Sequence, residues 1–249
     1  MRKFFITTGI ILLIAGIGIL LFLFISNQLY IQQAAKRCNL FDNQIIVDTK
    51  KRLDKNGRLT DGQGNIISDY PVLFRADVER LQKDSIEYNK ELKDNQFDML
   101  VSNLSYEKPA LSLSKYGIYD GVFGYIECSE INLKLPIYLG TGNNHMNYGA
   151  AHLTCTSLPI GGQNTNCVLA AHTGYIGKIM FDFVKNLSPG DTVKIKNYWS
   201  TLYYEVSKIK TVKPCEIEDI YIEEGKDLLT LVTCNYNGSK RYVIKCERK

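Results

Sequence analysis

The sequence predicts a mainly β protein, in which a closed β-barrel follows an N-terminal transmembrane helix and a helical membrane-proximal segment. Three observations favour this fold class. Residues 4–25 form an uncharged apolar run, residues after 111 form short Ile-, Val-, Tyr- and Leu-rich segments separated by glycine-containing turns, and 45% of the 249 residues are hydrophobic. A chain of this length and composition buries a substantial core, which excludes a disordered tail or a disulfide-stapled miniprotein.

Residues 4–25 are predicted to cross a membrane, because as a helix they would extend roughly 33 Å, enough for a bilayer core. Arg2 and Lys3 precede the run, whereas Lys36 and Arg37 lie well beyond it, so the N-terminus is expected in the cytoplasm and the rest of the chain outside. A cleaved signal peptide is the alternative. The run is longer than a typical apolar signal region and no A-x-A site follows closely, which favours an uncleaved anchor.

Charge and cysteine content narrow the function classes. Thirty Lys and Arg against 26 Asp and Glu give a net charge of +4, which gives no case for nucleic-acid binding. Seven cysteines would allow disulfides outside the cell, but the number is odd and no C-x-x-C pair occurs, so most are interpreted as small buried side chains. The three histidines are not spaced with cysteines as zinc ligands, and no metal or cofactor is predicted.

The chain divides into three predicted regions: residues 1–26 (cytoplasmic tip and anchor), 27–110 (helical membrane-proximal segment) and 111–249 (barrel). In the second region, FRADVERLQKDSIEYNKELKD has helical periodicity, and DKNGRLTDGQGNIISDYP before it is a turn-rich connection. The helical stripe is predicted to consist of Val78, Leu81, Ile86, Tyr88 and Leu92.

The barrel prediction depends on seven strand-like segments: GVFGYIEC, INLKLPIYLG, CVLAAHTG, DTVKIKN, LYYEVSKIKTV, DLLTLVTC and RYVIKCER. Their spacing is typical of a closed antiparallel barrel. CVLAA is apolar on both faces and is therefore expected to be a central strand.

Two strand ends carry residues suited to acyl transfer. Cys234 ends DLLTLVTC and precedes the turn Asn-Tyr-Asn-Gly, after which the next strand begins at Arg241, so a hairpin would bring the thiol and the guanidinium together. His172 ends another apolar strand, just before Thr173. A thiolate attacks a carbonyl, nearby positive charge favours the thiolate form, and an imidazole can protonate a leaving amine.

Residue types alone leave this assignment open, because a Cys or His at a strand end is more often structural than catalytic. His145 and His152 compete with His172, since both lie in the loop-rich stretch TGNNHMNYGAAHLTCTSLPIGG. Spacing does not decide among the three histidines.

The segments TLVTC, followed by a basic strand residue, and A-H-T-G resemble the two catalytic segments of the sortases. GYIECSEINLKLPIYLGT, GAAHLTCTSLPIGGQNTNCVLAAHTG and LSPGDTVKIK resemble successive barrel segments of the family, especially its class C, pilin-polymerising branch. The resemblance covers about 140 residues to the end of the chain, and such collinear agreement is more specific than the pentapeptide alone. It implies an eight-stranded sortase-like barrel.

The resemblance also implies a membrane-anchored cysteine transpeptidase of a Gram-positive surface that cleaves an LPxTG-like sorting signal after its threonine. The acceptor would be an amine, either a pilin lysine or a peptidoglycan precursor. By matching position, Cys234 is the nucleophile, His172 the acid/base partner and Arg241 the oxyanion-stabilising and substrate-orienting group. Thr233, Thr173 and His152 are expected substrate-binding residues, with His152 second to His172 among the histidines.

Three departures from the class C pattern bear on these expectations. The chain has no Asp-Pro lid motif, so SLSKYGIYDG is either a degenerate lid or none, and no transmembrane run follows CERK. Both features put pilus assembly, as opposed to attachment to peptidoglycan, in question. Cys155 occupies a loop position where glycine would be unsurprising and is expected near the cleft as an incidental small residue.

Two alternatives to this function remain at the level of sequence. One is a catalytically silent sortase-like surface module that binds a sorting peptide or a pilin without turning it over. The other is a different cysteine acyl-transfer enzyme, such as a papain-like peptidase or an L,D-transpeptidase. The second is disfavoured, because the chain has neither a C-G-S-C-W run nor an S-H-G-C segment.

Overall fold

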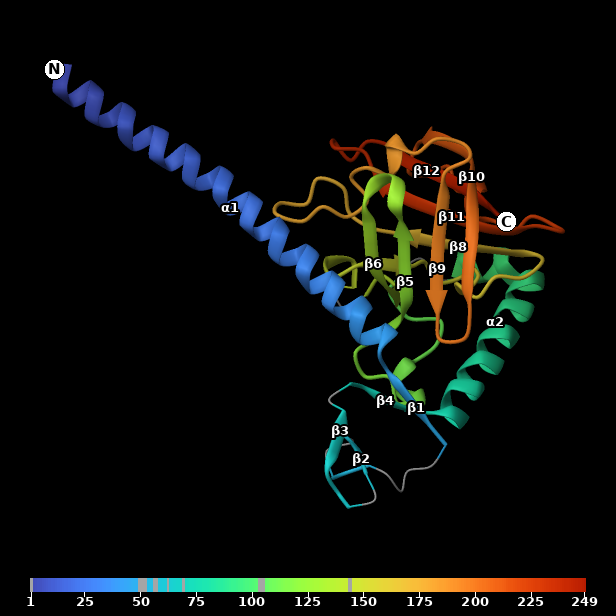
Figure 1. The fold of residues 1–249 in the computed structure, drawn as a ribbon. Helices are drawn as coiled ribbons and strands as arrows, with labels where there is room; N and C mark the ends of the chain where they lie inside the picture. The colour runs from blue at the N-terminus through green and yellow to red at the C-terminus, as the bar shows by residue number, and fades with distance from the viewer. Residues whose placement is uncertain are drawn as a thin grey trace.

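The computed structural model describes residues 2–48, 53–55, 58–61, 63–68, 70–102, 106–142 and 145–249. A long helix, α1, leaves the barrel as an arm, and a second helix, α2, lies along the barrel side (Figure 1). The helices and the strands outside the barrel are α1 (Arg2–Asp42), β1 (Ile45–Val47), β2 (Leu59–Thr60), β3 (Ile66–Ser68), β4 (Val72–Phe74) and α2 (Arg75–Ser102). The barrel strands are β5 (Val122–Cys128), β6 (Leu133–Leu139), β7 (Ala150–His152), β8 (Thr165–Ala170), β9 (Thr192–Asn197), β10 (Thr201–Val212), β11 (Asp227–Cys234) and β12 (Arg241–Arg248).

The barrel closes in the order β10-β12-β11-β8-β7-β6-β5-β9, with β9 paired to β10. The predicted closed eight-stranded barrel is confirmed, but it is not wholly antiparallel. Strand β6 pairs with β7, and β8 with β11, in parallel. A parallel pair requires a crossover connection, and between β8 and β11 the chain first builds β9 and β10, so that β11 enters beside β8 in the same direction.

Side-chain periodicity accounts for most of the strands. In β9 and β10 every second residue faces the core, among them Val193, Ile195 and Leu202. Strand β8 is buried along almost its whole length between β7 and β11, as its unbroken apolar run predicts. The sequence did not reveal β7, because a strand of three residues is too short to show a period.

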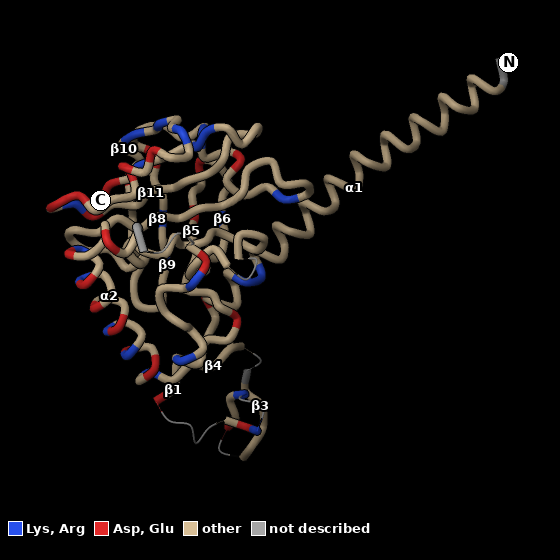
Figure 2. Tube along the Cα trace, turned by 180° about the vertical axis from the view of Figure 1, so that it is seen from behind, with Lys and Arg blue, Asp and Glu red and all other residues tan. Residues whose placement is uncertain are grey.

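Helix α1 continues without a break through the predicted region boundary at residue 26. Between residues 4 and 25 the helix is largely exposed and free of charged residues (Figure 2). By length and composition it can cross a membrane, which identifies it as a membrane anchor or a signal sequence. Beyond this stretch, Tyr30, Ala34, Cys38 and Phe41 are buried. Their spacing of three or four residues puts them on one helix face, and this face packs on β5 and β6.

Helix α2 coincides with the predicted helical segment, and Val78, Leu81 and Leu92 are buried as expected. Tyr88 is half-buried. The assignment of Ile86 to the buried stripe is wrong, because its side chain is 55% exposed. Ile86 breaks the three-to-four spacing of the stripe, which passes through its polar neighbour Ser85 instead.

Polar side chains complete the buried face of α2. Asn89 accepts a hydrogen bond from the Leu158 amide at 2.8 Å through Oδ1. Gln96 donates to the Cys155 and Ile220 carbonyls at 3.2 Å. These bonds satisfy backbone groups of loops that have no strand partner there, so α2 supports the connections of the barrel as well as its core.

Two small β units lie between the helices. Strands β1 and β4 pair in parallel, and β2 and β3 form a hairpin within the predicted turn-rich connection. Residues 56, 57, 62 and 69 of that connection lie outside the described residues.

The buried stripe of α1 makes residues 27–42 a structural part of the barrel. A chain beginning at residue 27 is expected to be soluble, folded and active on a soluble peptide. A chain beginning at residue 43 loses the burial of Tyr30 and Phe41, each worth about 1.5–3 kcal/mol, which lowers the unfolding midpoint by roughly 6–24 °C. Circular-dichroism melting of the two truncations compares them, and equal midpoints would show that the helix contributes nothing to the barrel.

Candidate active site

Cys234 and Arg241 occupy paired positions at one end of the barrel. They are register partners across the β11–β12 hairpin, so their Cα atoms are roughly 4.5–5.5 Å apart and their side chains lie on the same face. The connecting turn is closed by a hydrogen bond from the Asn235 amide to the Lys240 carbonyl at 3.0 Å. Gly238 in this turn has a φ of 71°, a left-handed conformation that favours glycine. The predicted juxtaposition of thiol and guanidinium therefore follows from the hairpin.

His172 reaches the same end through the parallel pairing of β8 and β11. Ala170, the last residue of β8, is the register partner of Val232, and His172 follows Ala170 by two residues, as Cys234 follows Val232. We call this end of the barrel the Cys234 rim: the ends of β8 and β11 with the start of β12. The three candidate catalytic residues therefore lie on one rim.

Threonine hydroxyls hold the two strand ends together. Thr233 donates to the Ala171 carbonyl at 2.7 Å, and the Thr173 and Thr233 hydroxyl oxygens are also 2.7 Å apart. Thr233 is buried and Thr173 is half-exposed. Both expected substrate-binding threonines thus lie at the rim, where the Thr233 hydroxyl already serves the joint between the strands.

No hydrogen bond or ion pair joins the three side chains to one another in the described part of the chain. The Arg241 guanidinium donates to the Gly238 and Lys240 carbonyls at 3.0 and 3.1 Å, within its own turn. Cys234 is a free, half-buried thiol. The rim therefore carries a nucleophile, a proton carrier and a cation at neighbouring strand ends, the groups that acyl transfer to a thiol requires.

The His172 imidazole lies against Tyr175, with ring centroids 5.2 Å apart. Partial burial lowers the pKa of His172, and the positive charge of Lys178 lowers it further. Because the unperturbed pKa of histidine is about 6.5, the neutral form predominates at pH 7. A neutral imidazole can accept a proton from a thiol and later return it to a leaving group.

Comparison with known proteins identifies the family of this chain. Residues 126–249 match the Sortase domain. The chain is 31% identical over 175 residues to sortase A of Streptococcus agalactiae serotype III, which covers 68% of this chain and 70% of that protein. The chain belongs to the sortase family.

Solved structures of class C sortases are similar to this sortase. Sortase C from Clostridium perfringens SM101 is 35% identical, with a TM-score of 0.57 over 70% of this chain and 90% of that one. Group B Streptococcus pilus island 1 sortase C2 is 29% identical, with a TM-score of 0.58 over 70% and 98%. The predicted family is confirmed: the protein is a sortase-family cysteine transpeptidase with class C structural neighbours and sortase A sequence relatives.

The loop that follows His172 in this sortase is fastened by a residue that sequence analysis missed. The buried carboxylate of Asp182 accepts hydrogen bonds from the Gly174 amide at 2.8 Å and the Met180 amide at 2.9 Å. The Phe181 amide donates to the His172 carbonyl at 3.1 Å. The available signal was an acidic residue between two phenylalanines in MFDF, since such a residue is buried only when its carboxylate is bonded.

His152 lies inside the protein. Its side chain has no exposed surface, and Nε2 faces the Thr156 and Ser157 carbonyls at 3.1 and 3.0 Å. Burial lowers its pKa to about 4, although the two carbonyls oppose this shift. The third histidine, His145, is bonded through Nδ1 to the Gly140 carbonyl at 2.9 Å. A substrate peptide at the Cys234 rim can touch the His172 imidazole, whereas the His152 imidazole is shielded.

The seven thiols differ in accessibility. In the described residues none of them forms a disulfide. Five are buried, whereas Cys215 is exposed and Cys234 is half-buried. Burial, the main cause, raises the pKa of Cys38 and of Cys128 to about 12, so both remain protonated. Among the described residues no group of three or more His, Cys, Asp and Glu could hold a metal ion.

The placement of Cys155 differs from its expected position near the cleft. The side chain is fully buried against α2, with its Sγ 3.4 Å from the Met99 carbonyl oxygen. Its φ of 68° is left-handed, which explains why a glycine would be natural at this position. The interpretation of Cys155 as an incidental small residue fits this burial, and its thiol is not exposed.

The stretch SLSKYGIYDG, considered as a degenerate lid, packs against α2. Its 3₁₀ helix, η2 (Leu113–Tyr116), is joined to α2 by a hydrogen bond from the Tyr116 hydroxyl to Asp84 at 2.6 Å. Arg80 of α2 bonds the Lys115 carbonyl. These contacts hold η2 on α2, away from the strand ends that carry His172 and Cys234.

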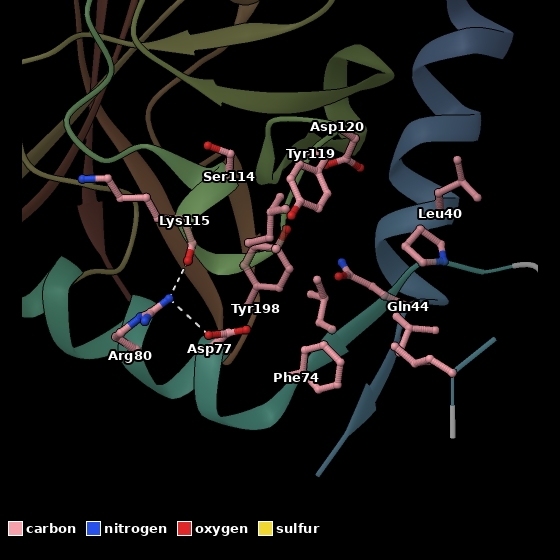
Figure 3. A pocket seen from close by; sticks show the side chains of 16 residues that line it. Leu40, Gln44, Phe74, Asp77, Arg80, Ser114, Lys115, Tyr119, Asp120 and Tyr198 are labelled. Carbon is pink, nitrogen blue, oxygen red and sulfur yellow. Dashed lines mark hydrogen bonds and ion pairs between the residues drawn. The ribbon is translucent and has the colours of Figure 1, made fainter. Parts of the chain in front are cut away.

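A cavity of about 720 Å³ lies beside η2, between the C-terminal end of α1 and the start of α2 (Figure 3). Arg80 forms an ion pair with Asp77 across part of its wall, at 3.1 Å. None of the described residues that line it is a cysteine or a histidine. The cavity is therefore separate from the acyl-transfer chemistry.

The shielded His152 makes stability depend on pH. The unfolded chain binds a proton at this residue near pH 6.5, whereas the folded protein does so only near pH 4, so stability is complete above pH 6.5 and falls as the pH drops toward 4. At pH 5 the loss is about 2 kcal/mol. Thermal unfolding between pH 5 and pH 7.5 measures it.

The matched variants are His152→Gln, which keeps an N–H donor but does not titrate, and His145→Gln as the control. The first is expected to flatten the pH dependence and the second to leave it unchanged. Parallel curves for wild type and His152→Gln would contradict the assignment.

Proposed function

We propose that this sortase is a membrane-anchored transpeptidase that cleaves an LPxTG-like sorting signal through a thioester on Cys234 and transfers the acyl group to an amine. The observation that carries the proposal is the convergence of three strand ends, which brings Cys234, His172 and Arg241 to one rim. The family supports a peptide substrate and an amine acceptor.

In the first half-reaction, His172 accepts the thiol proton of Cys234 while the sulfur attacks the carbonyl carbon of the signal's threonine. A C–S bond forms, the peptide C–N bond breaks, and the imidazolium gives its proton to the leaving glycine amine. The lowered pKa of His172 suits this role, because the imidazole begins neutral and returns its proton readily. The product is a thioester, and neither an oxidant nor a cofactor is consumed.

In the second half-reaction the acceptor amine attacks the thioester carbon. His172 takes a proton from the amine, the new C–N bond forms, and the departing sulfur of Cys234 regains a proton. The acceptor is either a pilin lysine or the amine of a peptidoglycan precursor. A structural neighbour from a Group B Streptococcus pilus island supports the pilin lysine.

Arg241 is proposed to hold the carbonyl oxygen of the sorting signal as negative charge develops there. Its position opposite Cys234 in the hairpin supports this role. The guanidinium would exchange its bonds to the turn carbonyls for bonds to the substrate. Thr173 and Thr233 would line the binding site, whereas the fully buried His152 would not touch the peptide.

The apolar half of α1 is proposed to be an uncleaved anchor, with residues 4–25 in the membrane and the barrel on the extracytoplasmic side. The buried stripe of α1 supports retention of the helix, because cleavage within it would expose apolar side chains. Such a placement brings the site to membrane-borne sorting signals.

Labelling with iodoacetamide tests the nucleophile. Of the two accessible thiols, Cys234 is expected to react much faster than Cys215, because the His172 imidazole can accept its proton whereas Cys215 lies on an exposed turn. Cys234→Ala should abolish the thioester detected by mass spectrometry with an LPxTG peptide, and Cys215→Ala should not. His172→Ala should be nearly as damaging while leaving the barrel folded. Equal labelling rates with no thioester would favour a catalytically silent peptide-binding module.

Arg241→Lys tests the oxyanion role. The substitution keeps the charge but removes the planar fork that donates two directed hydrogen bonds, so kcat/KM for the peptide should fall by roughly 100-fold. Lys240→Arg, in the exposed turn beside it, is the matched control and should leave kcat/KM unchanged. A wild-type kcat/KM in Arg241→Lys would show that Arg241 acts only as a surface charge.

A further inference from the structure

The loop that begins at His172 also touches α1 where its apolar run ends. The Ile179 amide donates to the Asn27 side-chain oxygen at 2.9 Å. Gly177, with a φ of 73°, comes so close to α1 that a Cβ added there would lie 2.7 Å from the Ser26 Cβ. Only a glycine permits this approach. The loop is therefore held against the turn of α1 that follows residue 25.

The tip of this loop carries large side chains with little cover. We define it as the apolar tip: Tyr175, Ile176, Ile179 and Phe183. Their exposed fractions are at least 40%, and Ile176 reaches 77%. Isoleucine and phenylalanine side chains so close together and so exposed favour a partner that is itself apolar.

Cations and aromatic rings surround the apolar tip. Lys178 lies within the loop, its Nζ 5.0 Å from the centre of the Tyr175 ring and 5.6 Å from that of Tyr30 on α1. Lys185 follows the loop, 4.7 Å from the ring centre of Tyr236, an exposed residue of the β11–β12 turn. Exposed apolar side chains bordered by tyrosine and lysine are typical of surfaces that enter the headgroup layer of a membrane.

The level of the membrane follows from α1. If residues 4–25 span the hydrocarbon core, Ser26 and Asn27 lie at its outer edge. The loop contacts α1 at these two residues, and in Figure 1 it projects from the barrel toward the helix arm. The apolar tip is thus at the height of the interface, on the side of the barrel from which the arm extends.

We propose that the apolar tip inserts into the headgroup layer of the bilayer that α1 crosses, so that the loop following His172 rests on the membrane. This inference rests on the proposed anchoring of α1. The Cys234 rim then faces the membrane surface, because His172 begins the same loop and Tyr236 belongs to the turn beside Cys234. A substrate that is itself held in the membrane would meet the site within the interfacial layer.

Tryptophan fluorescence in proteoliposomes tests the contact. The full-length chain carries Trp199→Phe, which removes the only tryptophan, and one reporter at a time: Ile176→Trp, Tyr119→Trp or Ile14→Trp. The vesicles contain equal amounts of phosphatidylethanolamine and phosphatidylglycerol, brominated either near the glycerol backbone or near the chain terminus. Tyr119, 85% exposed beside the cavity near η2, is the matched control away from the Cys234 rim.

Ile176→Trp is expected to lose more emission with shallow bromines than with deep ones, and more than Tyr119→Trp in the same vesicles. Ile14→Trp, within the apolar run, should be quenched most by deep bromines and reports the anchoring itself. Quenching of Ile14→Trp without quenching of Ile176→Trp beyond the control would overturn the contact and leave the anchor intact.

Two further outcomes would also overturn the contact. Absence of quenching at both Ile14→Trp and Ile176→Trp would remove the anchor and the contact together. A concentration-dependent blue shift at Ile176→Trp without lipid quenching would assign the apolar tip to a second copy of the protein. Thioester formation by each variant on a soluble LPxTG peptide, measured in parallel, keeps a failure of the catalytic proposal distinct from a failure of this one.

Discussion

The parallel pairing of β8 with β11 is the constraint on which the site depends. In an antiparallel pair the two carboxyl ends would lie at opposite ends of the barrel, and His172 would be separated from Cys234 by a strand length. Because the strands run together from Asp227 and Thr165, both carboxyl ends reach one rim. The hairpin to β12 then brings Arg241 to the same rim, because after a short turn the chain returns to the strand end that it left.

Hydrogen bonds from short side chains fix what the strand pairing has brought together. Thr233 bonds the Ala171 carbonyl just where the β8 ladder ends, and Asp182 closes the loop by binding two of its amides. A loop that leaves a sheet has unpaired backbone groups, and each of these bonds satisfies one of them. His172 is thus held between a strand joint and a closed loop, which would suit the proton transfer proposed for it.

The sequence predicted the barrel well because most strands are long enough to show their period. The turn residues after Cys234 located the end of β11, whereas β8 ends at Ala170, two residues before the predicted strand end at His172. The sequence could not reveal direction, since a parallel and an antiparallel neighbour have the same pattern of burial. The sequence also misassigned Ile86 and missed the buried polar residues of α2. Asn89 and Gln96 are buried because they bond carbonyls and amides that only the folded loops supply. The packing of α1 on the barrel was not predicted, because its buried stripe directly follows a uniformly apolar run and does not stand out from it.

Continuity of α1 changes what an anchor can do. A helix of 41 residues is about 60 Å long, of which roughly 33 Å would lie in the membrane core. The rest is packed on β5 and β6, so no flexible linker separates the anchor from the barrel. Under the proposed anchoring, helix packing would set the height and tilt of the barrel over the bilayer, and a peptide tethered in the same membrane would meet the Cys234 rim at a nearly constant distance. Such fixed geometry raises the effective concentration of a membrane-held substrate without any additional contact to it.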